Sequence, residues 1–167
     1  MIALRSASPA ATHEIAAAIA GLARAGDLLV LAGEMGSGKT WFTKGFAAEL
    51  GITDHITSPT FTLVHSYAGG RLPLHHADVY RLERMAEVAD LALGELLEES
   101  GTGKGGVVLV EWGDAVAAAL GPDYLEVRLD CDEDEPETAR HISVRGVGPS
   151  WAGRWNRLTT ALEPWRC

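Results

Sequence analysis

Two segments of the chain are apolar at almost every position, which is typical of strands buried on both faces of a sheet. The first covers residues 27–32, between Gly26 and Gly33, and the second covers residues 107–110 and leads into Glu111. Strands of this kind are characteristic of parallel sheets that helices cover on both faces. The two segments therefore predict the centre of an α/β sheet.

Shorter segments have the spacing of antiparallel hairpins. They are residues 62–67 and 72–78, joined by 68–71, and residues 124–130 and 140–145, joined by the acidic loop 131–137. We expect the second hairpin to extend one edge of the sheet. Residues 1–6 are expected to add a short strand.

Helical spacing of apolar residues predicts helices between these strands. The first begins with the N-cap Ser8 and with Pro9, and Gly26 is its candidate stop; the second follows residue 40 and is ended by Gly51. The positions expected to face the core are Ile15, Ala18, Ile19 and Leu22 in the first helix, and Trp41, Phe42, Phe46, Ala47 and Leu50 in the second.

Three later segments also favour helices. Residues 83–99 are acidic and helix-prone, and Asp114 is expected to cap a short helix that runs to Leu120. Ser150 is expected to cap a last amphipathic helix that carries Trp151, Trp155, Leu158 and Leu162. This Trp-rich segment, residues 150–167, either covers the core or offers a surface to a partner, and core cover is favoured.

The order of these elements predicts an α/β fold. We expect a P-loop NTPase-like three-layer domain with a mixed, partly parallel central sheet and antiparallel hairpin additions. A chain of 167 residues is long enough for one ordinary core, so residues 1–167 are expected to form a single domain.

Composition and charge restrict the partners and the compartment that we expect. The chain has 14 basic and 23 acidic residues, a formal charge of −9, so its net charge shows no electrostatic nucleic-acid footprint. Cys131 and Cys167 have no metal-ligand spacing and favour a reducing compartment. No apolar run approaches the roughly 20 residues of a membrane span, so we expect a cytoplasmic protein without a membrane partner.

The segment between the first apolar strand and the second helix fits the phosphate-binding loop pattern, in which Gly is followed after four residues by Gly-Lys and Ser or Thr. Its glycines allow backbone N–H groups to point at an anion, Lys39 would contact the outer phosphates and Thr40 would ligate Mg²⁺. The predicted nucleotide-binding residues are Gly33, Glu34, Met35, Gly36, Ser37, Gly38, Lys39, Thr40 and Trp41.

Two acids are candidates for catalysis. Glu111 follows the second apolar strand, where the acidic residue of a Walker B element emerges beside the phosphate loop; the alternative is a surface Glu that ends a strand. Asp78 ends a predicted strand next to His75 and His76, and its alternative is a turn-capping Asp. We expect His76 to be a packed or hydrogen-bonded histidine rather than a base or a metal ligand, and the two histidines to form no zinc site.

A polar loop after the second helix is a candidate nucleotide switch, although its spacing alone leaves the question open. Its residues are Ser58, Pro59, Thr60 and Phe61.

Taken together, these segments make the chain resemble the TsaE family, also called YjeE, which are bacterial P-loop ATPases of tRNA modification. The resemblance spans about residues 8–130 and rests on segments in the family's order and spacing. They are residues 31–40, Phe42 with Lys44-Gly45, residues 58–61, residues 76–82 and Glu111-Trp112.

The resemblance implies an ATPase that works with ATP, Mg²⁺ and the partner proteins TsaB and TsaD to place a threonylcarbamoyl group on an adenosine of tRNA. The tRNA is reached indirectly, through the complex. By the same resemblance Thr40 and Glu111 would hold Mg²⁺, Asp78 would act near the phosphates, directly or through water on the metal, and residues 58–61 would form the switch loop. Trp41 departs from the family, which usually has a small hydroxyl residue there.

Two other functions stay open. A nucleotide-dependent assembly switch would bind ATP and dock to partners, with incidental hydrolysis. A P-loop small-molecule kinase would need an Arg-rich lid, whereas residues 83–99 are acidic. An ATPase of the expected kind should be slow without its partners, because the sequence shows no complete set of water-orienting and Arg-finger groups.

Overall fold

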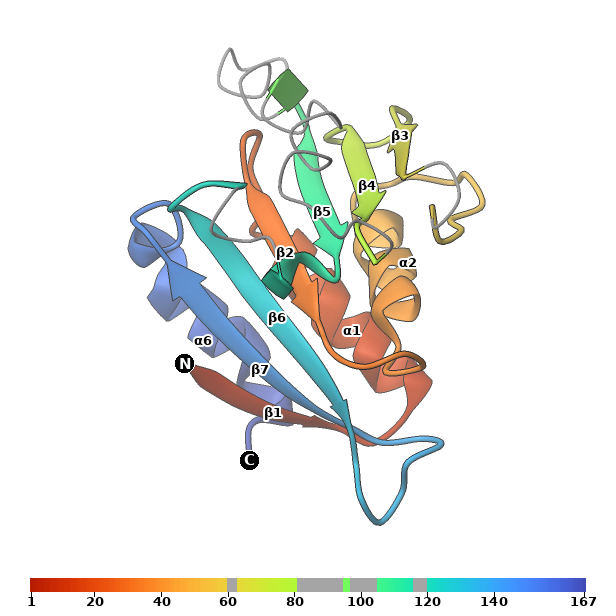
Figure 1. Cartoon of the computed structure of the whole chain (residues 1–167). Helices are drawn as coiled ribbons and strands as arrows, with labels where there is room; N and C mark the ends of the chain where they lie inside the picture. The colour runs from red at the N-terminus through yellow and green to blue at the C-terminus, as the bar shows by residue number, and fades with distance from the viewer. Residues whose placement is uncertain (60–62, 81–94, 97–104, 116–119) are drawn as a thin grey trace.

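The strands of the chain form one mixed sheet in the order β1-β7-β6-β2-β5-β4-β3 (Figure 1). This computed structural model describes residues 1–59, 63–80, 95–96, 105–115 and 120–167. The strands are β1 (Ile2–Ser6), β2 (Leu28–Ala32), β3 (Val64–Tyr67), β4 (Leu74–Asp78), β5 (Val107–Glu111), β6 (Tyr124–Cys131) and β7 (Arg140–Val147). The helices are α1 (Pro9–Ala20), α2 (Lys39–Glu49) and α6 (Trp155–Leu162), with 3-10 helices η2 (Gly113–Ala115), η3 (Ala152–Arg154) and η4 (Glu163–Trp165).

The centre of the sheet is parallel and its two flanks are antiparallel. β2 pairs in parallel with both β5 and β6, and β4 pairs in parallel with β5. The ladders β1–β7, β6–β7 and β3–β4 are antiparallel. The expected α/β fold with a mixed, partly parallel sheet and hairpin additions is thus confirmed.

The second hairpin extends the sheet beyond β2, as the sequence predicted, but it does not form the outermost strand. β6 lies beside β2, and β1 pairs with β7 to form the edge. Leu125, Val127 and Leu129 of β6 are fully buried, so this strand gains more apolar burial next to β2 than it would at an edge.

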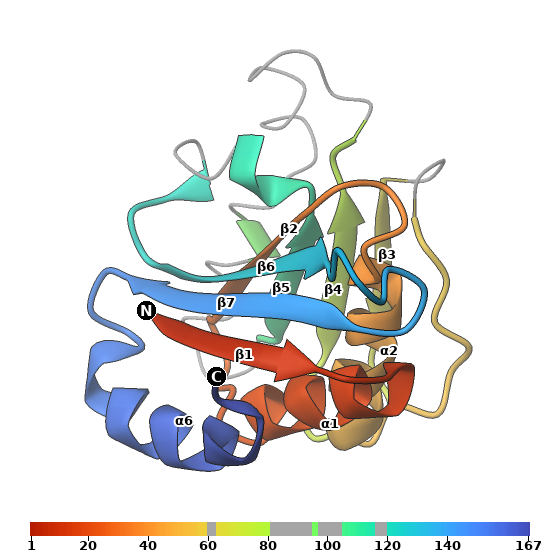
Figure 2. The same cartoon turned by 90° about the horizontal axis from the view of Figure 1, so that it is seen from below.

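Helices α1, α2 and α6 lie on the same side of the sheet (Figure 2). Leu29 and Leu31 of β2 face them, within a core that includes Phe42 and Phe46 of α2. Leu28 and Val30 point to the opposite face, as alternation along a strand requires. Leu96, Trp112, Leu120 and Tyr124 pack on that opposite face. Both faces of the central strands are therefore covered.

Several predicted helix boundaries were wrong. α1 does begin with Ser8, whose hydroxyl accepts the Ala11 N–H at 3.1 Å, but it ends at Ala20 instead of at Gly26. Gly26 has a φ of +92° and lies in the turn that leads into β2. Ser150 is not an N-cap, because Trp151 precedes η3 and Arg154 precedes α6; its hydroxyl donates instead to Asp123 Oδ1 at 2.6 Å. Trp41 lies outside the buried stripe of α2 and is 41% exposed.

The C-terminal segment covers the core, as favoured from the sequence. Trp151, Leu158 and Leu162 are fully buried against the cluster that contains α1. Asp114 lies within η2, while residues 116–119 of its expected helix and most of the helix-prone stretch 83–99 are outside the described residues. None of the helices in the described part of the chain is long and apolar enough to cross a membrane.

Candidate functional site

The segment between β2 and α2 has the backbone conformation of an anion-binding loop. Gly33, Gly36 and Gly38 have φ values of +131°, +80° and +102°. A Cβ on Gly33 would lie 2.1 Å from the Leu129 carbonyl oxygen, so this position requires glycine. No side chain caps the N-terminus of α2. Its first N–H groups are therefore left for an anion, which the helix dipole also favours.

Lys39 is held inside the loop. Its ammonium donates to the carbonyl oxygens of Gly33 and Glu34, both at 2.8 Å, and lies 3.7 Å from the centre of the Trp112 ring. Burial lowers the pKa of Lys39, and the nearby charges of Glu111 and Asp78 oppose that shift. The ammonium is thus a desolvated cation, which attracts an anion more strongly than a solvated one does.

The Trp112 ring that covers this cation packs in turn against Tyr80. The Tyr80 and Trp112 ring centres are 4.8 Å apart, and Trp112 has an unusual φ of +62°. Bulky residues seldom adopt this left-handed conformation, which costs about 1–3 kcal/mol and persists where the surroundings enforce it.

The two candidate acids lie side by side. Asp78 and Glu111 are register partners at the carboxyl ends of the parallel strands β4 and β5. The Thr40 hydroxyl donates to Glu111 Oε1 at 3.0 Å, and the Ser58 hydroxyl donates to Asp78 Oδ2 at 3.1 Å. The backbone N–H of Tyr80 donates to Asp78 Oδ1 at 2.9 Å. Residues from three separate segments thus meet at the start of α2.

His76 completes this group, although no active role was predicted for it. Its Nε2 is 2.8 Å from Glu111 Oε1, and both side chains are almost completely buried. Its Nδ1 has no hydrogen-bond partner within the described residues. His76 and Asp78 are two residues apart on one strand, so they share a face. That spacing was a signal for placing His76 near Asp78, but not for its contact with Glu111.

One cleft of about 480 Å³ joins most of the predicted site. Its lining comprises Met35, Gly36, Gly38, Lys39, Thr40 and Trp41 of the loop and α2, with Ser58, Asp78, Tyr80, Glu111 and Trp112. Gly33, Glu34, Ser37 and Pro59 lie outside this lining. Thr60 and Phe61 of the predicted switch loop lie outside the described residues.

Arg140 is a second residue that sequence reasoning missed. From the start of β7, its Nε donates to the Ser37 carbonyl at 2.8 Å and its Nη2 to the Gly36 carbonyl at 3.3 Å. The guanidinium therefore holds the outer side of the loop. Its separation of 103 residues from Ser37 left no local signal in the sequence.

Comparison with known proteins decides the family. A family model described as "Threonylcarbamoyl adenosine biosynthesis protein TsaE" matches residues 6–142. The chain belongs to the TsaE family. The match begins in β1 and ends in β7, so it includes every described strand at least in part.

Curated TsaE relatives match most of this chain. The "tRNA threonylcarbamoyladenosine biosynthesis protein TsaE" of Bacillus subtilis is 42% identical over 144 residues, covering 86% of this chain and 85% of that protein. The protein of the same name from Streptomyces coelicolor is 41% identical, covering 84% and 93%.

A solved structure is also similar. It is titled "Crystal structure of Bacillus subtilus YdiB" and matches with a TM-score of 0.72 and 34% identity, over 98% of this chain and 97% of that one. A match of this extent includes most of residues 150–167. The Trp-rich segment of this TsaE-family chain therefore has a structural counterpart, although the sequence resemblance offered none.

The ring of Trp41, a departure from the family pattern, is accommodated on α1. Its indole N–H donates to the Pro9 carbonyl at 2.9 Å, and the ring stacks on His13 with centres 4.3 Å apart. The bulky side chain thus lies across α1 and α2 without displacing Lys39 or Thr40.

Among the described residues of this TsaE-family chain, no group of three or more His, Cys, Asp and Glu side chains could hold a metal ion.

Proposed function

We propose that this chain is the ATP-binding and ATP-hydrolysing subunit of the machinery that makes N6-threonylcarbamoyladenosine in tRNA, acting with TsaB and TsaD. The tRNA would be reached through that complex. The observation that carries the proposal is the 3.0 Å hydrogen bond from Thr40 to Glu111, which joins the phosphate loop to the acid at the end of β5. The names of the relatives support the tRNA-modification part.

The donor set fits Mg²⁺. This ion prefers oxygen ligands and is usually bound by one or two carboxylates together with phosphate oxygens and water. The Thr40 hydroxyl and the Glu111 carboxylate would hold it, and Asp78 would do so through water. When bound, Mg²⁺ would neutralise charge on the phosphates of ATP.

Lys39 would contact the outer phosphates. In the structure its ammonium is bound by two carbonyl oxygens, which are neutral acceptors. A phosphate oxygen is charged and forms a stronger, charge-assisted hydrogen bond with an ammonium. ATP would therefore draw Lys39 away from the carbonyls of Gly33 and Glu34.

A second function, an assembly switch, is favoured by the rim of the cleft. Met35, Trp41 and Tyr80 all line it and are 70%, 41% and 50% exposed. Exposed apolar residues that gather around a site are typical of a surface that a partner covers. A partner docked here would be sensitive to the nucleotide beneath it.

The test is ATP turnover with and without purified TsaB and TsaD. We expect slow turnover alone and faster turnover in the complex. Lys39→Ala should abolish nucleotide binding, while Glu111→Ala and Asp78→Ala should reduce turnover by at least tenfold with the complex still formed. Glu133→Ala, an acid-to-alanine change on the exposed β6–β7 loop, is the matched control.

Two results would decide against hydrolysis as the function, and a third would decide against the tRNA-modification role. Full tRNA modification by Glu111→Ala, despite lost turnover, would favour the assembly switch. Lost assembly in that variant would favour the same switch. Unchanged turnover with added partners, together with no detectable complex, would refute the tRNA-modification role.

A further inference from the structure

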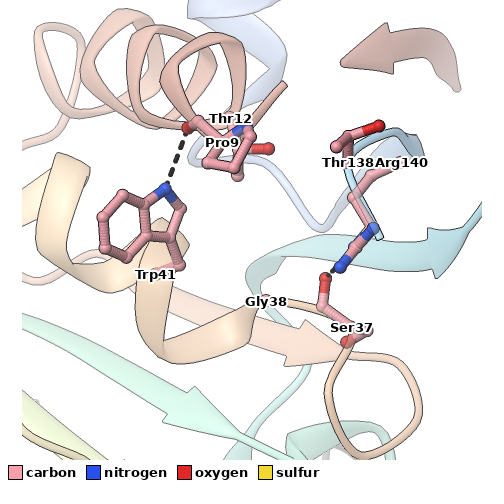
Figure 3. A pocket seen from close by; sticks show the side chains of 7 residues that line it. All are labelled: Pro9, Thr12, Ser37, Gly38, Trp41, Thr138 and Arg140. Atoms are coloured by element: carbon pink, nitrogen blue, oxygen red, sulfur yellow. Dashed lines mark hydrogen bonds between the residues drawn. The ribbon is translucent and has the colours of Figure 1, made fainter. Parts of the chain in front are cut away.

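The phosphate loop and the neighbouring acid are each contacted by a residue from outside their motifs. Arg140 donates to the Ser37 carbonyl, and Figure 3 shows its guanidinium directed at that oxygen. Its second contact with the loop is also a backbone oxygen, that of Gly36. His76 instead contacts the side chain of Glu111, which is proposed to hold Mg²⁺. The two residues should therefore affect different parts of the site.

The sheet itself places the His76 ring beside the Glu111 carboxylate. Asp78 is the register partner of Glu111 on the neighbouring parallel strand, and His76 lies two residues before Asp78. Residues two apart on a strand project from the same face, so these side chains share one face of the sheet. The His76 Nε2 is 2.8 Å from Glu111 Oε1, and the two side chains are 0% and 4% exposed. The contact is thus built into the fold.

The His76 ring has one polar contact among the described residues. An ionised carboxylate accepts hydrogen bonds and donates none, so Nε2 carries the hydrogen of this contact. Nδ1 is buried and has no hydrogen-bond partner in the described part of the chain. The ring also lies outside the lining of the large cleft. His76 therefore acts on a nucleotide in the cleft only through Glu111.

Glu111 has little other support. Within the described ranges, its carboxylate accepts hydrogen bonds only from Thr40 and His76. Thr40 lies 3.0 Å from Oε1 and 3.3 Å from Oε2, whereas His76 binds Oε1. Thr40 is itself a proposed ligand of Mg²⁺. His76 is thus the one described support of Glu111 that does not depend on the ion.

We propose that His76 is a positioning residue that holds Glu111 through Oε1 and leaves Oε2 for Mg²⁺. This assignment rests on the proposed function, because it requires Mg²⁺ beside Thr40 and Glu111. A carboxylate that is already held loses less side-chain entropy when the ion binds. Partners that orient a metal ligand in this way typically contribute about 10–100-fold to metal affinity or activity.

The test measures binding of AMP-PNP, an ATP analogue that resists hydrolysis, by isothermal titration calorimetry in excess Mg²⁺ and in EDTA. The unaltered protein should bind it more tightly in Mg²⁺. His76→Leu should remove most of this Mg²⁺ advantage, a weakening of about 10–100-fold in Mg²⁺. It should leave binding in EDTA unchanged, because the phosphate loop is intact. A general structural fault would weaken binding in both.

Two amide variants separate the position of the donor from polarity alone. The side-chain nitrogen of Gln is as many bonds from Cα as Nε2 of His, whereas that of Asn corresponds to Nδ1. His76→Gln should therefore recover most of the Mg²⁺ advantage and His76→Asn should not. This pair carries the test if His76→Leu does not fold. His75→Leu, on the opposite face of β4, is the control and should alter neither measurement.

The outcomes distinguish this inference from the proposed function. The positioning role is wrong, and the nucleotide site stands, if His76→Leu keeps the Mg²⁺ advantage or weakens binding equally in Mg²⁺ and EDTA. It is also wrong if the Gln and Asn variants behave alike. If the unaltered protein binds AMP-PNP no better in Mg²⁺ than in EDTA, the proposed Mg²⁺ site and the positioning role fail together. If it does not bind AMP-PNP at all, the proposed function fails.

Discussion

The buried ion pair between Arg154 and Asp27 offers the sharpest stability prediction. Arg154 donates to both carboxylate oxygens of Asp27 at 2.7 Å, and the two side chains are only 3% and 4% exposed. Arg154 also donates to the carbonyls of Leu22 and Ser150. One guanidinium therefore joins the C-terminal segment to the turn that leads into β2.

Arg154→Met keeps the apolar stem and removes the charge. It leaves the Asp27 carboxylate buried with one remaining donor among the described residues, the Arg24 N–H at 2.7 Å. Breaking a buried pair in this way costs about 3–5 kcal/mol, a large part of the roughly 5–15 kcal/mol that stabilises a typical protein. For a chain of this size the loss corresponds to a fall of about 6–20 °C in Tm.

Urea unfolding followed by circular dichroism measures the change. Arg145→Met is the matched control, because Arg145 pairs with Glu126 at 2.9 Å while remaining 53% exposed. Solvent screens such a pair, so its loss should cost at most about 1 kcal/mol. The double variant Asp27→Asn, Arg154→Met should recover part of the loss. If Arg154→Met costs no more than Arg145→Met, the reasoning is refuted.

Three further predictions follow from single contacts. His76→Leu removes the partner of Glu111 and should raise the Mg²⁺ concentration needed for half-maximal ATP turnover about 10–100-fold. His75→Leu on the opposite face should leave that concentration unchanged, and equal effects of the two variants would contradict a positioning role. Gly45→Ala would place a Cβ 2.7 Å from His13 Cα and should cost about 1–3 kcal/mol in urea unfolding, whereas Gly153→Ala meets nothing within 4 Å and should cost less. Burial lowers the pKa of His13, so its contribution to stability is complete above its unfolded pKa of about 6.5 and is lost as pH falls through the folded value. His13→Asn should therefore lose less stability than the unaltered protein between pH 7.5 and 5.5, and an equal loss would exclude His13 as the cause.

The central strand and the phosphate loop were predictable because their signals are local. The residues of β2 alone predict a buried strand, and the glycines within residues 33–38 permit the positive φ values that the loop requires. The position of Glu111 beside the loop was also predictable, since the parallel strands of such a fold end next to it.

The neighbours of each element were not predictable in the same way. Alternation along β6 shows that one face is buried, but not whether the strand borders β2 or an edge. Gly21 lies inside the predicted helical pattern, which reaches Leu22, and Gly26 lies after it, so the choice between them as the end of α1 depends on how the following turn packs. Long-range packing decides such boundaries, and it leaves no periodic trace in the sequence.

The same distinction separates the parts of the candidate site. Residues proposed to touch the nucleotide lie in short motifs, because an anion is bound by neighbouring backbone groups and a few adjacent side chains. Residues that hold those motifs in place come from distant strands: Arg140 of β7 contacts the loop, and His76 of β4 contacts Glu111. Their side chains are set by the fold rather than by the motif. A change at either position should therefore alter the geometry of the site without removing any proposed ligand, which makes these two residues the best probes of whether the motif alone is sufficient for activity.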